Sequence, residues 1–272
     1  MRRRLVIAVI AAVVFAAAIA FGTSLRRKSA PRGKAPAPAG GAVEEPILDA
    51  ATIDEETDGG FLASDGRHYP VRTFRVALEK SVAKIEDVAM STALDEVLDR
   101  AHADLVVNAG FFDPKGRPLG LARTDGTTLS PLLKNLSGGV VTVEGDIARL
   151  WEAESFTLPE AAKFAVQCRP RLVVGGKPNV KSDDGKRSER TALCLRDDGK
   201  VVDVLVIHAK DVGEPTGPSL FALGRFLARH GCQDALNLDG GPSTGVAYRE
   251  DGVTKVLAPR AGVRHAIAFV AK

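Results

Sequence analysis

Short runs of alternating or continuous hydrophobic residues recur from about residue 61 onward, and most of them predict β-strands. Alternation is typical of a strand with one buried face, and a short apolar run between turn residues is typical of a strand buried on both faces. The predicted strands are residues 68–78 (a hairpin or strand pair), 105–107, 138–156 (a meander), 165–174, 190–195, 201–208, 235–239 and 266–270.

Two stretches have the helical spacing of apolar residues instead. Residues 93–101 follow Ser91, a suitable N-cap, and residues 220–230 follow Ser219 and stop at Gly231. Because the strands are many and the clear helices are two, we expect an α+β fold. It would be a single domain around a mixed, mainly antiparallel β-sheet with a few helices.

The N-terminal part of the chain differs in composition from the rest. Leu5 to Phe21 is a continuous apolar run behind Arg2-Arg3-Arg4, which predicts either a signal peptide or a membrane anchor. Ala18-Ile19-Ala20 resembles a cleavage site, whereas the length of the run favours an uncleaved anchor, and both interpretations remain open. In either case we expect the body to be exported, to the periplasm or another extracytoplasmic space, with the membrane as a partner of the anchor. The predicted parts are residues 1–28 (signal peptide or anchor), 29–60 (Pro/Ala/Gly-rich and acidic linker) and 61–272 (the globular domain).

The positive charge of the chain is confined to this N-terminal part. Eight of the 37 Lys and Arg side chains lie in residues 1–34, which contain no acidic residue, so the rest carries 29 against 34 Asp and Glu. A slightly acidic body does not support nucleic-acid binding, and we expect no nucleic-acid partner.

The cysteines and histidines give little indication of a metal or cofactor. Cys168, Cys194 and Cys232 are too few and too irregular for a zinc site or a disulfide scaffold. Cys168 and Cys194 could pair in an oxidising compartment, but ordinary buried thiols are the favoured interpretation. The five histidines lack metal-ligand spacing. We therefore expect no cofactor and no metal.

Polar residues follow two predicted strands at the points where the strands end. Residues 235–245 deliver Asn237 and Asp239 to a turn with two glycines, Gly240 and Gly241, which let the backbone approach a ligand. An isolated Asp-Gly-Gly would more often be a simple tight turn. Residues 108–112, Asn-Ala-Gly-Phe-Phe, repeat the pattern of strand end, polar residue and glycine.

Four segments in this order resemble the phosphodiester glycosidase domain family. They are residues 108–112, Gly120 with 123–126, Arg190-Thr191 and residues 237–244, and the resemblance covers about residues 61–272. The resemblance implies an exported hydrolase that cleaves a sugar joined through a phosphodiester at its anomeric carbon. Bacterial members are described as exopolysaccharide-related, so a phosphate-linked sugar or glycan of the envelope or of an exported polymer is the expected substrate.

The residues of these segments suit that chemistry. A phosphodiester is anionic, so an arginine fork is its natural anchor; Arg190 is the first candidate, and Arg169 or Arg123 the second. Asp239 can act on the anomeric centre or a water, or protonate the leaving oxygen. We name Asp239, Asn108 and Arg190 as the candidate catalytic residues. The candidate substrate-binding residues are Asn237, Gly240, Gly241, Ser243, Thr244, Arg169, Arg123 and Gly110.

One position departs from the family pattern. Pro242 stands where members usually carry glycine or serine, and proline lacks the amide donor that a complete backbone anion nest would use. Two alternatives therefore remain open. One is a non-catalytic envelope protein that binds phosphorylated glycans, and the other is a metal-assisted phosphodiesterase with Asp239 and Asp125 as ligands.

Overall fold

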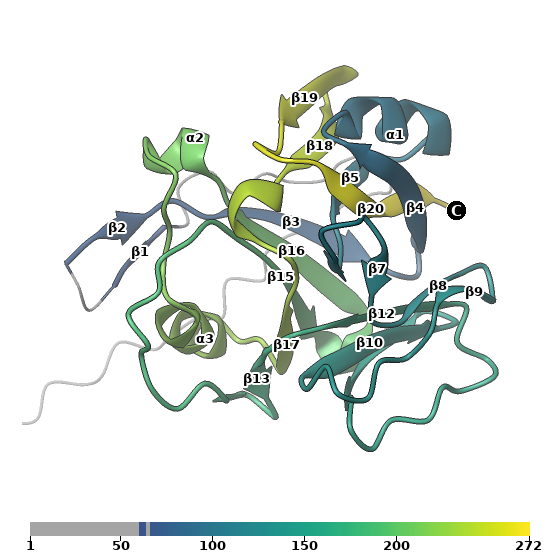
Figure 1. Cartoon of the computed structure of the whole chain (residues 1–272), viewed down its shortest axis with the longest axis horizontal. Helices are drawn as coiled ribbons and strands as arrows, with labels where there is room; N and C mark the ends of the chain where they lie inside the picture. The colour runs from purple at the N-terminus through teal and green to yellow at the C-terminus, as the bar shows by residue number, and fades with distance from the viewer. Residues whose placement is uncertain (1–59, 64–65) are drawn as a thin grey trace, which may run out of the picture. The chain divides into compact units, whose positions relative to one another are not determined.

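The computed structural model describes residues 60–63 and 66–272, and the predictions for the signal peptide, the anchor and the linker up to residue 59 lie outside them. The described residues form mainly antiparallel sheets with short helices at their outer faces (Figure 1). No helix in this part of the chain is long and apolar enough to cross a bilayer.

Three main sheets make up the body, and every strand pair within the described ranges is antiparallel. The six-stranded sheet has the order β14 (Lys177–Pro178), β13 (Arg171–Val174), β17 (Asp234–Asn237), β15 (Arg190–Arg196), β16 (Val201–Ile207) and β3 (Arg72–Ala77). One five-stranded sheet has the order β19 (Val253–Leu257), β18 (Val246–Glu250), β5 (Leu105–Asn108), β20 (Val263–Ala271) and β4 (Ser81–Ser91). The other has the order β11 (Ile147–Glu152), β10 (Gly139–Glu144), β12 (Phe164–Cys168), β8 (Ala122–Thr124) and β9 (Thr127–Ser130).

Small elements complete the fold. They are the two-stranded sheets β1 (Phe61–Leu62) with β2 (His68–Tyr69) and β6 (Phe111–Phe112) with β7 (Pro118–Leu119), the helices α1 (Leu94–Ala101), α2 (Ala209–Val212) and α3 (Leu220–Arg229), and the 3-10 turns η1 (Asp197–Gly199) and η2 (Gly241–Ser243). The predicted sheet-dominated, mainly antiparallel fold with few helices is confirmed, but the strands divide among three main sheets instead of surrounding one.

The central core lies where the three sheets turn their inner faces toward one another. The sequence of strand β16 is almost entirely apolar, and its place between two apolar clusters explains why. Val202, Val204 and Val206 point into this central core, whereas Leu205 and Ile207 point the other way and pack in the cluster beneath α3. Both faces of the strand are covered, so nearly every position is apolar.

Each of the two longer helices covers the outer face of one sheet (Figure 1). Helix α3 begins as predicted, because the Ser219 Oγ accepts a hydrogen bond from the Ala222 amide at 3.2 Å. The predicted N-cap of α1 is wrong: Ser91 is the last residue of β4, and its Oγ accepts a hydrogen bond from the Ala93 amide before the helix begins.

Two predicted strand regions divide in the structure. Residues 165–174 were expected to form one strand, but β12 and β13 belong to different sheets and are separated by Arg169 and a cis Pro170. Residues 68–78 do not form a hairpin, because β2 pairs with β1 while β3 pairs with β16. In both regions the apolar pattern continues while the chain passes from one partner strand to another. The pattern itself gives no sign of that change.

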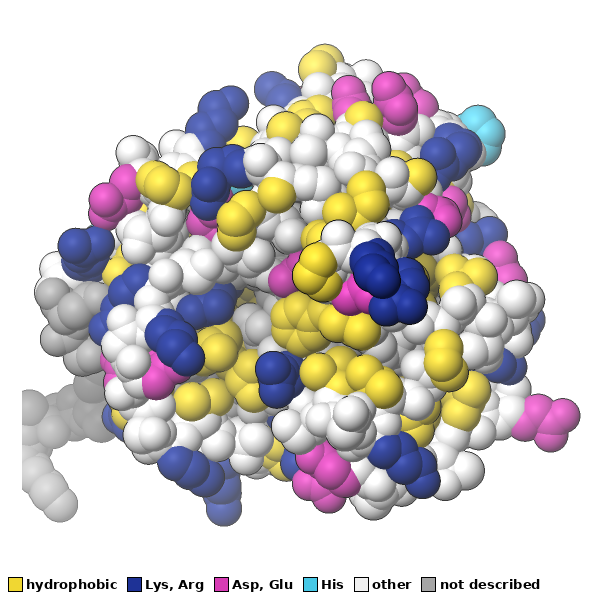
Figure 2. Space-filling view, in the orientation of Figure 1, with side chains coloured by type: hydrophobic (Ala, Val, Ile, Leu, Met, Phe, Trp, Pro, Cys, Tyr) yellow, Lys and Arg dark blue, Asp and Glu magenta, His cyan; other side chains and the backbone are white. Residues whose placement is uncertain are grey.

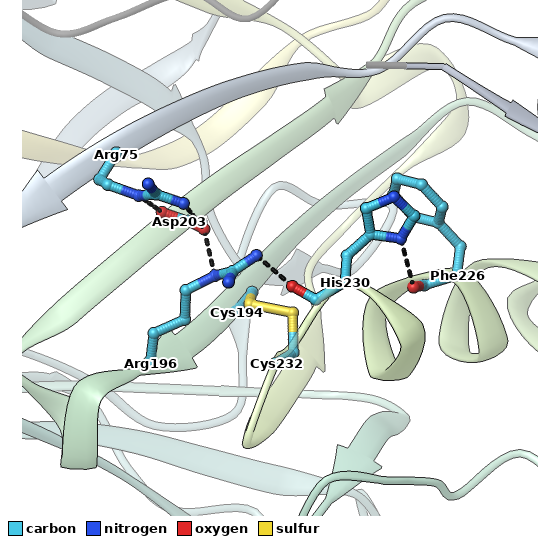
Figure 3. Close-up of a disulfide and its surroundings, with 7 residues drawn as sticks. All are labelled: Arg75, Cys194, Arg196, Asp203, Phe226, His230 and Cys232. Atoms are coloured by element: carbon cyan, nitrogen blue, oxygen red, sulfur yellow. Dashed lines mark hydrogen bonds and ion pairs between the residues drawn. A yellow bond between two sulfur atoms is a disulfide. The ribbon is translucent and has the colours of Figure 1, made fainter. Parts of the chain in front are cut away.

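The disulfide joins Cys194 in β15 to Cys232, just after α3 (Figure 3). Cys168 is a free, buried thiol. The favoured interpretation as buried thiols is therefore confirmed for Cys168 and wrong for Cys194 and Cys232. The alternative pairing of Cys168 with Cys194 is also wrong, because Cys168 points into the central core, whereas Cys194 points toward α3 from the opposite face of its sheet.

Trp151 is the single tryptophan of the chain and lies in the edge strand β11. Its indole Nε1 donates a hydrogen bond to the Thr142 Oγ1 of β10 at 2.9 Å, and its ring lies 6.1 Å from that of Phe156. The indole is thus held against the sheet formed by β8 to β12.

Candidate functional site

A cleft of about 940 Å³ opens where the ends of several strands meet. Strand β17 lies between β13 and β15, so the residues that follow β17 come next to those that precede β13 and to the first residue of β15. Asn237 to Pro242, Arg169 to Arg171 and Arg190 all line this cleft. The face shown in Figure 2 carries basic side chains around a centre of exposed hydrophobic ones.

Asp239 lies at the end of the motif strand, largely buried in the wall of the cleft. Its backbone amide donates to the Ala109 carbonyl at 3.0 Å, which fixes the segment against the end of β5. The Oδ1 accepts a hydrogen bond from the Gly240 amide at 2.9 Å. Burial raises the pKa of this carboxyl, although the Gly240 amide and the Ser243 hydroxyl partly oppose the shift.

Arg190 opens β15 and is largely buried beside the same cleft. Its Nε donates to the Pro218 carbonyl at 3.1 Å, and one terminal nitrogen lies 3.4 Å from the Lys186 carbonyl. No carboxylate within the described ranges forms an ion pair with it. Burial lowers its pKa to about 10. The charge of the Asp184 carboxylate partly opposes this shift, but a largely buried guanidinium that no carboxylate of the described residues bonds directly is suited to binding an anion.

Asn108 ties three segments together behind the cleft and is fully buried. Its Nδ2 donates to the Asp239 carbonyl at 2.7 Å, and its Oδ1 accepts from the Thr191 hydroxyl at 2.6 Å and the Gly245 amide at 3.2 Å. The side chain does not line the cleft. The geometry therefore makes Asn108 a positioning residue, since it holds Asp239 but does not face the space a substrate would occupy.

Asn237 and Arg169 both line the cleft. The Asn237 Nδ2 donates to the carbonyls of Arg169 at 2.9 Å and Leu238 at 2.6 Å. Its buried Oδ1 has no hydrogen-bond partner among the described residues. Arg169 is exposed, and in the part of the chain that the structure describes no carboxylate pairs with it. The exposed Arg169 guanidinium is therefore available to a ligand, whereas the Asn237 Oδ1 is covered by the protein.

The glycines of the motif are needed for close packing. A side chain at Gly240 would place its Cβ 2.8 Å from the Glu189 carbonyl, and Gly241 has a φ of +60°. The amides of this turn donate within the protein: Gly241 to the Glu189 carbonyl, Ser243 to the Gly240 carbonyl and Thr244 to the Gly241 carbonyl. The expected backbone cradle for phosphate is therefore occupied by internal hydrogen bonds, and Pro242 adds no donor.

The remaining predicted residues lie away from the open cleft. Ser243 and Thr244 are buried beneath the motif turn. Gly110 is buried too, and a Cβ there would lie 3.3 Å from both the Gln167 carbonyl and the His265 ring. Arg123 is in β8, where its Nε donates to the Ala162 carbonyl at 2.7 Å. The structure does not bring Arg123 to Asp239.

Several charged cleft residues were not predicted, because three of them lie in the loop before β15, Arg171 opens β13 and Glu154 lies in the turn after β11, and none has a pattern that marks a site. The additional charged lining residues are Arg171, Lys186, Arg187, Glu154 and Asp184. Arg171 pairs with Glu152, Arg187 with Asp183 at 3.1 Å, and Lys186 lies 3.5 Å from Asp184. The charges of these three basic residues are largely compensated, which leaves Arg169 and Arg190 as the unpaired cations of the described cleft.

Glu189 was also missed, although it stands next to Arg190. It is 1% exposed, and its Oε2 pairs with Arg260. A glutamate before Arg-Thr gives no signal in the sequence, because the arginine that neutralises it is 71 residues away.

Metal ligands are not gathered in this site. Across residues 60–63 and 66–272, no three His, Cys, Asp or Glu side chains come close enough together to hold a metal ion. Asp125, proposed with Asp239 as a metal ligand, instead lies 3.4 Å from Lys84.

A family model described as phosphodiester glycosidase matches residues 101–270. No curated protein matches the sequence. Among solved structures, the zebrafish N-acetylglucosamine-1-phosphodiester alpha-N-acetylglucosaminidase catalytic domain, auto-inhibited by its pro-peptide, has a TM-score of 0.60 at 16% identity, over 85% of each chain.

Two bacterial structures share the fold. A hypothetical protein from Synechocystis has a TM-score of 0.57 at 16% identity, over 78% of this chain and 61% of that one, so this chain spans less than two thirds of it. A protein described as exported from Burkholderia pseudomallei has a TM-score of 0.57 at 13% identity, over 77% and 76%.

Proposed function

Because the chain belongs to the phosphodiester glycosidase family, we propose that it hydrolyses a sugar-1-phosphodiester in an envelope or exported glycan. Water would add to the anomeric carbon while the bond from that carbon to the phosphate oxygen breaks. The products are a free sugar and a phosphomonoester. The proposal rests on the cleft residues described above and on the family to which the chain belongs.

The observation that carries the proposal is that one cleft contains both a group suited to binding phosphate and a group suited to proton transfer. Arg190, a largely buried cation that forms no direct ion pair within the described residues, shares the cleft with Asp239, a carboxyl whose burial raises its pKa. The first suits a phosphate anion and the second suits proton transfer. The exposed Arg169 adds a second positive charge on the same cleft.

The leaving group decides which role suits Asp239 best. A phosphomonoester leaves as a stable anion, since its second pKa is about 6, so it needs charge stabilisation more than a proton. We assign that stabilisation to Arg190. The Asp239 carboxylate then takes the proton of the attacking water, and its raised pKa makes it a stronger base than an ordinary aspartate.

We also propose that the protein acts outside the cytoplasm, exported by the signal peptide or held by the membrane anchor of residues 1–28. The Cys194–Cys232 disulfide supports this location, because disulfides persist in oxidising compartments. The slightly acidic body does not support a nucleic-acid partner.

The test measures release of free sugar by the full chain in detergent, from UDP-N-acetylglucosamine and from a methyl phosphodiester of N-acetylglucosamine. We expect turnover with and without a chelator, and its loss in Asp239→Asn with folding retained. Chelator-sensitive turnover would favour the metal-assisted phosphodiesterase. Binding of the phosphodiester without any turnover would favour the non-catalytic phosphoglycan-binding protein.

A further inference from the structure

We propose that the buried Glu189 and the partly exposed Arg260 form a brace that positions the loop carrying Asp239, and that both are positioning residues of the site. The inference rests on the proposed function for its kinetic consequence, but its structural consequence can be measured without any turnover. Neither residue belongs to the motifs that identify the family in this sequence, and neither lines the cleft.

Both carboxylate oxygens of Glu189 accept hydrogen bonds from the protein. Its Oε1 accepts from the Ala209 amide at 2.8 Å, and its Oε2 accepts from the Arg260 Nε at 3.1 Å and from a terminal nitrogen of the same guanidinium. Its side chain is 1% exposed. A carboxylate buried this deeply is costly unless such partners compensate it.

Both members of the brace also hold the motif loop through their backbones. The Glu189 carbonyl accepts from the Gly241 amide at 2.9 Å. From the other side, the amides of Arg260 and Ala261 donate to the Pro242 carbonyl at 2.8 and 2.9 Å. The turn that follows Asp239 is therefore held between two backbone segments that the Glu189–Arg260 ion pair joins.

The brace acts on Asp239 and leaves the anion anchor largely alone. The Arg190 guanidinium is held by the carbonyls of Pro218 and Lys186, whereas the side chains of Glu189 and Arg260 bond to each other and to the Ala209 amide. Loosening the turn should misplace the Asp239 carboxyl and leave phosphate binding nearly intact. This predicts a change in kcat with little change in KM, and a purely structural role would not produce that split.

The experiment compares Glu189→Gln with Asp203→Asn, a matched control. Asp203 is likewise 1% exposed and pairs with two arginines, Arg75 and Arg196 (Figure 3). It does not line the cleft. We expect Glu189→Gln to lower kcat by about 10- to 100-fold with KM changed less than about twofold. Asp203→Asn should leave both unchanged in the folded fraction.

Arg260 provides a second set of variants, because its side chain is 41% exposed and tolerates replacement more readily than Glu189. We expect kcat to fall in the order wild type, Arg260→Lys, Arg260→Gln at constant KM. The double variant Glu189→Gln/Arg260→Gln should be no slower than the slower single variant, because either substitution alone already breaks the same ion pair. Equal kcat values for wild type and Arg260→Gln, or a rise in KM alone, would overturn the proposal.

Hydrogen exchange separates this inference from the proposed reaction. The amides of residues 239–241, 243 and 244 should exchange faster in Glu189→Gln than in Asp203→Asn. If the wild type turns over no phosphodiester but this difference is found, the brace stands and the proposed function fails. If the wild type is active while neither exchange nor kcat responds, the brace fails and the proposed function stands.

Discussion

Replacing Asn108 with leucine is expected to destabilise the protein strongly, although the two side chains have similar shapes. The substitution removes the hydrogen bonds to the Asp239 carbonyl, the Thr191 hydroxyl and the Gly245 amide. It leaves all three groups facing an apolar side chain in a fully buried position. At about 1–2 kcal/mol for each unsatisfied group, the loss is roughly 3–6 kcal/mol, a large part of the ~5–15 kcal/mol that stabilises a typical domain.

The assay is urea unfolding of the full chain followed by circular dichroism. The free energy of unfolding should fall by the amount above, with the m-value unchanged. Asn179→Leu is the control, because its Nδ2 makes a single bond of 3.0 Å to the Arg171 carbonyl in a partly buried position, worth about 1 kcal/mol. If Asn108→Leu costs no more than Asn179→Leu, the three hydrogen bonds do not support the fold as described.

Three further results are expected. Arg190→Gln should raise KM for a phosphodiester substrate by roughly 10-fold or more, as the loss of a charged hydrogen bond implies; an unchanged KM in steady-state kinetics would remove Arg190 as the anchor. Cys232→Ser should lower the free energy of unfolding by about 3–4 kcal/mol, because the disulfide closes a loop with a sequence separation of 38; an unchanged urea midpoint would contradict this. Burial raises the pKa of Asp239 in the folded state, so its ionisation costs stability as the pH rises through that pKa. Asp239→Asn should therefore melt higher than wild type at neutral pH and lose this advantage below the unfolded pKa, whereas a constant difference across pH would argue against burial as the cause.

The sequence predicts strands well where both faces of a strand are buried or where it alternates regularly. Strands β5, β15 and β16 are found where the pattern places them, and α3 begins at its predicted cap. The division of residues 165–174 between two sheets could not be predicted. Alternation records which face of a strand is buried, but not against which neighbour it pairs.

Some site residues could be predicted from the sequence and others could not, because only some of them belong to a local sequence pattern. Asp239, Asn237 and Arg190 could be named because they lie at strand ends beside glycines or in a recognisable motif. The brace of Glu189 with Arg260 could not, because its two residues are far apart in sequence and each alone resembles a surface charge. Asn108 was found, but only the structure shows that it turns inward to hold Asp239 in place.

The single tryptophan has a consequence for every spectroscopic measurement on this protein. The Trp151 indole is hydrogen-bonded to Thr142 in the sheet of β8 to β12, so its fluorescence emission reports the unfolding of that sheet. Circular dichroism reports all three sheets at once. If the unfolding curves from fluorescence and circular dichroism coincide, the sheets around the common core unfold as one cooperative unit. If the two curves separate, the distance between their midpoints measures how independently the tryptophan-bearing sheet unfolds.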